Sequence, residues 1–211
     1  MKIIFLLPVL LIFQNFYAQE NYKDKKPADS LRVFYNNDFH EVKEYQQGDF
    51  GTGDLAKNII LFIGDGMGTT QLFSGLTANK GQLFMKNFKY IGFSKTSSAS
   101  DIITDSGAGG TAIATGKKTY NGAISVDTNK NVIPTILELA EKKGKATGLV
   151  STSSITHATP ASFIAHEESR SHYEAIAKDF LDVDIDVFMG GGKKHFKDRK
   201  DGLDLTKTLE E

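Results

Sequence analysis

The stretch TDSGAGGTA, residues 104–112, joins a polar start to a run of small residues. This pattern predicts a loop that places Ser106 at the N-cap of a helix, where its hydroxyl accepts from a free amide. The small residues from Ala108 to Thr115 predict close packing of that helix against a sheet, and Gly116 predicts its end. Helix N-termini attract phosphate, so Ser106 stands where a phosphate would bind. A plain helix cap remains the alternative.

Three glycines occupy the first turns of this expected helix, at positions 107, 109 and 110. Each weakens a helix by roughly 1 kcal/mol relative to alanine. Their presence therefore indicates that something other than helix stability selected them. We expect the close approach of a ligand or of a strand.

Upstream, the apolar run Asn58–Ile63 predicts a central strand buried on both faces, as in a parallel sheet. The loop Gly64–Gly68 follows it and carries Asp65. Because ligands bind beyond the carboxyl ends of strands in open α/β sheets, Asp65 occupies a site-forming position. It can equally cap the next helix, which we expect over residues 69–76. Residues 90–104 suit another strand with its connection.

Downstream, the composition alternates between helix and strand. Asn121-Gly122 predicts a turn, and Pro134 opens a helix that ends at Gly144. The remaining expected elements, in order, are a strand at 146–150, a polar loop at 151–157, a helix starting at Thr159-Pro160, a helix at 173–181 and a strand at 186–189. This alternation predicts the α/β class.

The N-terminus has the pattern of an export signal, with Lys2 before the apolar run Ile3–Phe13 and a cleavage site after Ala18. Residues 1–18 are therefore predicted to be a signal peptide, and 19–56 a polar leader segment. The run is too short to span a bilayer, so no stable membrane anchor is expected. A formal net charge of −1 gives no bulk attraction to nucleic acid. The absence of cysteine excludes a disulfide framework.

Polar residues that can do chemistry follow several of these elements: Asp65, Asp105, Ser106, His157, Thr159 and Arg170. Carboxylates and hydroxyls suit Mg²⁺ or Zn²⁺. A serine needs a base or a metal to become a nucleophile, and no Gly-x-Ser-x-Gly elbow surrounds Ser106, so metal activation fits better. The arginine fork matches phosphate, although a surface salt bridge is the alternative role for Arg170. His157 can equally be a satisfied loop histidine.

Taken together, four motifs resemble the alkaline phosphatase family in order and spacing over most of residues 57–192. They are 58–68, 104–116, 118–122 and 157–170. The resemblance implies a three-layer α/β/α sandwich around a large, mostly parallel sheet, which is incomplete in this chain. It also implies two Zn²⁺ and one Mg²⁺ per site, and hydrolysis of phosphate monoesters through a phosphoserine.

Carried onto this sequence, the resemblance makes Ser106 the nucleophile and a zinc ligand. Arg170 binds the phosphoryl oxygens, and Asp105 orients that guanidinium. Asp65 bridges Mg²⁺ and one Zn²⁺, and Thr159 is a Mg²⁺ ligand. His157 is expected near the Mg²⁺ site, where the family has either Asp or His.

Family members continue for roughly as long again beyond the position matching Glu211. We therefore expect residues 57–211 to be the N-terminal part of a catalytic domain whose remaining metal ligands lie elsewhere. The resemblance further implies a homodimer, and the export signal implies a periplasmic or secreted protein. Two alternatives stay open: a phosphodiesterase or sulfatase relative on the same scaffold, and an inactive secreted phosphate-binding remnant.

Overall fold

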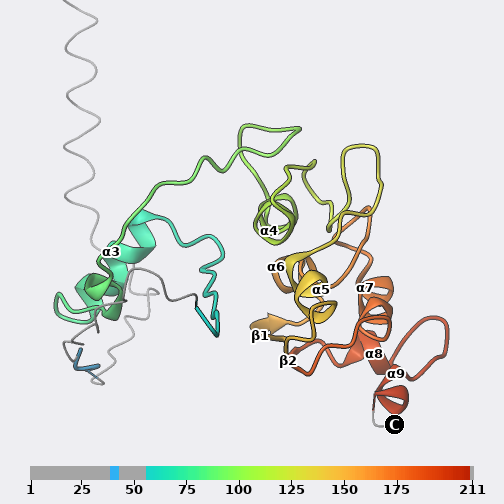
Figure 1. Cartoon of the computed structure of the whole chain (residues 1–211). Coiled ribbons are helices and arrows are strands. Elements are labelled where there is room, and N and C mark those ends of the chain that lie inside the picture. The colour runs from blue at the N-terminus through green and yellow to red at the C-terminus, as the bar shows by residue number, and fades with distance from the viewer. Residues whose placement is uncertain (1–38, 43–55, 210–211) are drawn as a thin grey trace, which may run out of the picture.

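A computed structural model describes residues 39–42 and 56–209 of the chain. The expected signal peptide, 1–18, and most of the expected leader, 19–56, lie outside the described residues. Figure 1 shows two parts of the molecule. We call residues 56–97 the N-terminal region and residues 98–209 the C-terminal body. An extended segment around residues 90–105 connects the helices of the first part to those of the second.

The N-terminal region contains the helix α3 (Thr69–Ala78) and the short 3₁₀ helix η1 (Phe84–Asn87). The side chain of Gln71 accepts from the Gly68 N–H at 3.1 Å, which caps the start of α3. The helix predicted at 69–76 is therefore confirmed. The Asn79 side chain, just after the helix, donates to the His40 carbonyl at 2.9 Å and so holds residues 39–42 against this region.

The predicted strands at 58–63 and 90–104 are not formed. Ile59 is 86% exposed and Phe62 is 89% exposed, so the first run is an uncovered extended segment. A strand exists through hydrogen bonds to neighbouring strands, and within the described residues the only sheet is a pair elsewhere in the chain. The apolar composition of 58–63 predicted burial, but among the described residues no segment covers this run.

The C-terminal body holds the remaining helices and both strands (Figure 1). In chain order they are α4 (Ser106–Thr115), α5 (Ile136–Glu141), β1 (Gly148–Ser154), α6 (Ala158–Ala161), α7 (Tyr173–Asp179), β2 (Val187–Gly191), α8 (Lys194–Lys197) and α9 (Leu205–Thr208). The helices predicted near Pro134, near Thr159 and at 173–181 are confirmed, with α5 starting after a Thr135 cap. Gly122 has a φ of 91°, as the predicted Asn-Gly turn requires.

The two strands pair in parallel, with Gly148 opposite Val187 and Val150 opposite Met189. The parallel arrangement confirms the α/β class. The predicted strand 146–150 was too short, because β1 runs through Ser154 into the expected polar loop. Serine is tolerated there because this stretch is largely exposed. A strand needs apolar side chains only on a face that is buried.

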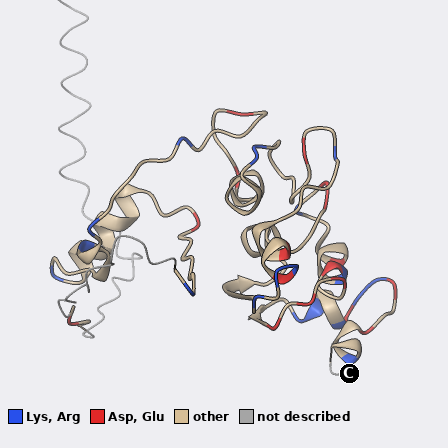
Figure 2. Cartoon of the chain, viewed as in Figure 1, with Lys and Arg blue, Asp and Glu red and all other residues tan. Residues whose placement is uncertain are grey.

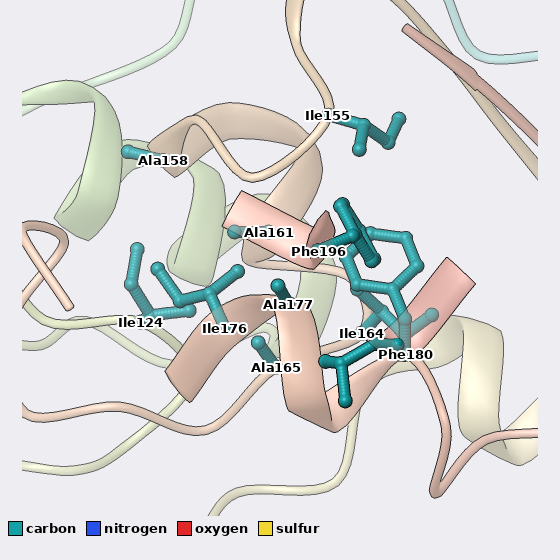
Figure 3. Packing of buried hydrophobic residues seen from close by; sticks show 11 residues of the cluster. Ile124, Ile155, Ala158, Ala161, Ile164, Ala165, Ile176, Ala177, Phe180 and Phe196 are labelled. Carbon is teal, nitrogen blue, oxygen red and sulfur yellow. The ribbon is translucent and has the colours of Figure 1, made fainter. Parts of the chain in front are cut away.

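The core lies between the strands and helices α6, α7 and α8. Figure 3 shows aliphatic residues meeting aromatic rings in this cluster. The Phe180 and Phe196 ring centroids are 5.7 Å apart in an edge-on arrangement, a favourable geometry for aromatic pairs. The buried members are Ile124, Ile155, Ala158, Ala161, Ile164, Ala165, Ile176, Ala177, Phe180, Phe196 and Leu205.

Helix α4 packs against α6 and α5, rather than against a sheet as the small-residue pattern predicted. A Cβ at Gly110 would lie only 2.8 Å from Ser162 Oγ. A Cβ at Gly107 would lie 2.8 Å from the carbonyl oxygen of Ala123. These two glycines therefore allow a neighbouring helix and a turn to approach closely. Gly109 has only ordinary contacts, so its selection is not explained this way.

Charged residues of both signs are spread along the ribbon (Figure 2), in keeping with the net charge of −1. Among the described helices, none combines the length and the hydropathy needed to cross a membrane.

Candidate active site

The start of helix α4 differs in one detail from the prediction. Asp105, not Ser106, is the N-cap: its Oδ1 accepts from the Ala108 N–H at 2.9 Å. Ser106 is thus the first residue of the helix, and its hydroxyl does not serve as the helix cap. The predicted stop at Gly116 is confirmed by a φ of 73°. Asp caps as well as Ser does, so the sequence Asp-Ser offered two candidates, and the one nearer the N-terminus has the role.

Arg170 reaches the start of α4 from a segment more than sixty residues downstream. Its Nη1 donates to Asp105 Oδ2 at 2.9 Å and lies 3.4 Å from Ser106 Oγ. The side chains of Arg170 and Asp105 are 27% and 25% exposed, so this ion pair is half-buried. The two motifs that the sequence left far apart therefore meet, with a hydroxyl and a guanidinium facing one place.

The charge state of Asp105 follows from these contacts. Burial raises its pKa, but the hydrogen bonds from the Ala108 N–H and the Arg170 guanidinium outweigh burial and lower the pKa below its ordinary value. Asp105 is thus a carboxylate at neutral pH and holds Arg170 by a charge-assisted hydrogen bond. With only one nitrogen of the fork on Asp105, the other, Nη2, is directed elsewhere.

His157 lies on the far side of the guanidinium. Its Nε2 is 3.4 Å from Arg170 Nη2, and the residue is the N-cap position of α6 without a side-chain cap bond. For Arg170 to donate, Nε2 must be the unprotonated ring nitrogen. The structure therefore brings His157 against the arginine.

Asp65 comes to the body from the N-terminal region. Thr159 Oγ1, on α6, donates to Asp65 Oδ2 at 2.8 Å across 94 residues of sequence. This contact brings together two residues predicted to share a Mg²⁺ site. Asp65 remains exposed and does not cap α3, where Gln71 takes that part.

The turn after α4 contacts both halves of the site, and sequence reasoning gave it no role there. Asn121 Oδ1 accepts from the Asp105 N–H at 3.1 Å, and the Gly122 carbonyl accepts from the Arg170 N–H at 2.7 Å. The Asn-Gly signal predicted a turn but could not show which segments the turn touches.

The donor atoms present fit one type of metal better than another. The Asp65 carboxylate and the Thr159 hydroxyl are adjacent hard oxygen donors, which suit Mg²⁺. A zinc site takes three or four protein ligands. In residues 39–42 and 56–209, no group of three or more His, Cys, Asp or Glu side chains is arranged to hold an ion. The residues described therefore do not complete the zinc centres expected from the resemblance.

Comparisons with known proteins all point to one family. Residues 56–210 match the alkaline phosphatase family model. Alkaline phosphatase 3 of Bacillus subtilis strain 168 is 45% identical over 170 residues, which cover 74% of this chain and 37% of that protein. The alkaline phosphatase of Escherichia coli K12 is 38% identical over 170 residues, covering 67% and 36%.

The solved structures agree as well. A variant of the alkaline phosphatase from the Antarctic bacterium TAB5, with Mg bound in its M3 site, superimposes with a TM-score of 0.68 at 44% identity. The match covers 69% of this chain and 42% of that one. The chain thus spans little more than a third of the length of the curated relatives it matches, and the fold is an incomplete version of theirs. This chain belongs to the alkaline phosphatase family.

Proposed function

We propose that this chain carries the nucleophile and the phosphate-binding arginine of an alkaline phosphatase, an enzyme that hydrolyses phosphate monoesters. The observation that supports this most directly is the meeting of Ser106 and Arg170, 3.4 Å apart at the start of α4. The arginine fork binds phosphate oxygens, and the helix start favours negative charge near the hydroxyl. The family match supplies the same expectation independently.

In the proposed reaction, Ser106 Oγ attacks the phosphorus of the ester. The bond from phosphorus to the leaving oxygen breaks, the alcohol departs, and a phosphoserine remains. Water then attacks that phosphorus, releasing inorganic phosphate and regenerating the hydroxyl. Arg170 binds two phosphoryl oxygens and offsets their charge in both steps. Asp105 keeps the guanidinium in place through its 2.9 Å hydrogen bond.

Mg²⁺ is proposed to bind at Asp65 and Thr159, with His157 close by and without a direct metal bond. When bound, the ion would supply positive charge near the reacting phosphoryl group. A variant of the TAB5 relative has Mg bound in its M3 site, which supports Mg²⁺ as the ion. Two zinc ions are expected from the family resemblance, with Asp65 and Ser106 as this chain's contribution, and the described residues do not complete their sites.

Two further features belong to the same proposal. Export is proposed from the signal-like residues 1–18, which would place the protein in the periplasm or outside the cell. A homodimer is proposed from the family resemblance. N-terminal sequencing of the exported protein should begin near Gln19, and a mature protein that still begins at Met1 would contradict export.

The activity is best tested in a complete scaffold. In alkaline phosphatase 3 of B. subtilis, the matched segment is replaced by the corresponding part of this chain. The chimera should hydrolyse a phosphate monoester and, at acidic pH, accumulate phosphate on the Ser106 peptide. Ser106→Ala should remove that phosphoserine and lower turnover steeply. Arg170→Ala should lower catalytic efficiency roughly ten- to hundredfold, the loss expected for a charge-assisted bidentate contact.

Controls separate the function from its alternatives. Ser74→Ala, on α3 and remote from the site, should keep phosphoserine formation and turnover unchanged. A Ser106→Ala chimera with full activity would overturn the nucleophile assignment. Preference for a diester or a sulfate ester would point to the related activities. Phosphate binding by this chain together with an inactive, well-folded chimera would favour the phosphate-binding alternative.

A further inference from the structure

The turn Tyr120–Gly122 lies between the loop that precedes Ser106 and the segment that carries Arg170. In the described part of the chain, this turn makes hydrogen bonds to both. The side chains of Tyr120 and Asn121 both bind backbone groups. Their contacts therefore bear on where the reacting groups are held.

On the serine side, the Asn121 side chain bridges Thr104, the residue before the helix cap. Its Oδ1 accepts from the Asp105 N–H at 3.1 Å, and its Nδ2 donates to the Ile103 carbonyl at 3.0 Å. These two bonds fix the backbone on either side of Thr104. Since Asp105 caps α4, the direction in which the loop enters the helix, and with it the position of Ser106, depends on this amide.

On the arginine side, two bonds hold the downstream segment. The Tyr120 hydroxyl donates to the Glu168 carbonyl at 2.9 Å, and the Gly122 carbonyl accepts from the Arg170 N–H at 2.7 Å. The turn also lies against the first turn of α4, where a Cβ at Gly107 would be 3.3 Å from the carbonyl carbon of Gly122. The backbone of the turn is thus in contact with both segments and has little room to shift.

We propose that the turn Tyr120–Gly122 is a positioning element that sets the distance between the Ser106 hydroxyl and the Arg170 guanidinium, with Asn121 as the positioning residue on the serine side and Tyr120 on the arginine side. The inference rests on the proposed function, because the distance matters for a phosphoryl group that both residues contact. Neither residue touches the substrate. Each acts through backbone groups of the residues that do.

The test uses the full chain, with inorganic phosphate as the probe. Phosphate affinity is measured by titration well below the melting temperature, and the side-chain Nε–H resonance of Arg170 is followed by NMR. Asn121→Ala should weaken phosphate binding roughly three- to tenfold and move the Arg170 resonance, as expected for the loss of a hydrogen-bonded support. Tyr120→Phe removes only the hydroxyl and should weaken binding about two- to threefold.

Asn131→Ala is the matched control. Asn131 is also a turn asparagine, but its side-chain amide donates to Asp127 and to neither Asp105 nor Arg170. It should change neither phosphate affinity nor the arginine resonance. A purely structural role for Asn121 predicts a lower melting temperature with unchanged affinity and resonance, and that result would overturn the proposal.

The test still discriminates in two further cases. If Asn121→Ala does not fold, Tyr120→Phe carries the test, and wild-type affinity with an unmoved arginine resonance in that variant would overturn the proposal. If the wild-type chain binds no phosphate, the proposed function loses support, while the Arg170 resonance still shows whether the turn positions the guanidinium.

Discussion

The C-terminal body and the N-terminal region differ in what covers their apolar residues. In the body, Phe180 is 2% exposed and packs among other rings, whereas Phe62 in the N-terminal region is 89% exposed. Phe62 lies in an apolar run, whereas Phe180 lies in a mixed sequence with Lys178 and Asp179 just before it. The difference shows that an apolar run specifies burial only where a second surface exists to meet it.

Phenylalanine removal should separate the two parts most clearly. Phe180→Ala should lower the free energy of unfolding by about 3–5 kcal/mol, because it leaves a cavity in a closed core. Phe62→Ala removes a ring already in water and should change stability by less than about 0.5 kcal/mol. Urea unfolding measures both. Equal losses would mean that 58–63 is buried after all.

Replacing a glycine by alanine in the two longer helices should change stability in opposite directions. Gly110→Ala, in α4, forces a Cβ against Ser162 at 2.8 Å and should destabilise by about 1–3 kcal/mol. Gly75→Ala, in α3, meets nothing closer than 3.9 Å and should stabilise by about 0.5–1 kcal/mol. Thermal unfolding of the two variants decides the point. A stabilised Gly110→Ala would show that α4 and α6 are not tightly packed.

Acid should weaken the body through Glu138. This carboxylate accepts from the Thr135 N–H and pairs with His166. Burial raises its pKa, but those bonds outweigh burial and hold the pKa below the ordinary 4.5. Its stabilisation is therefore fully present above pH 4.5 and is lost as the pH falls through the lower, folded-state pKa.

Glu138→Gln should accordingly cost about 1 kcal/mol at pH 7 and flatten the loss of stability below pH 4.5. Unfolding free energies measured from pH 7 to pH 3 provide the check. Glu168→Gln is the control, because Glu168 forms an exposed ion pair with Lys130. It should change the unfolding free energy little at pH 7 and at pH 3. If Glu138→Gln lost stability below pH 4.5 as steeply as the wild type, Glu138 would not be the group responsible.

The smallest effect is expected at the contact between the two parts. Thr159→Val removes an exposed hydrogen bond to Asp65 and should change stability by less than about 0.5 kcal/mol. The same variant should weaken any Mg²⁺ binding, which a titration with the metal can measure separately. A large loss of stability would mean that this bond anchors the N-terminal region.

Much of the body was predictable because its signals are local. The end of α4 at Gly116, the turn at Gly122 and the helix over 173–179 depend on backbone preferences of a few neighbouring residues. The cap of α4 was misassigned because Asp105 and Ser106 are both good caps. The strand over 58–63 was wrong because strand formation depends on a partner, which local sequence does not contain.

The sequence by itself determined which chemical groups are present and where most of the longer helices lie: a serine next to a carboxylate, an arginine whose fork suits phosphate, and glycines at the start of a helix. Only the tertiary structure decided that Ser106, Arg170 and the Asn121 turn meet at one place, and that Asp65 reaches Thr159. The physical reason is the sequence separation over which each kind of interaction acts. Capping and turn formation act over a few residues, whereas contacts across 16 to 94 residues depend on how the whole core packs.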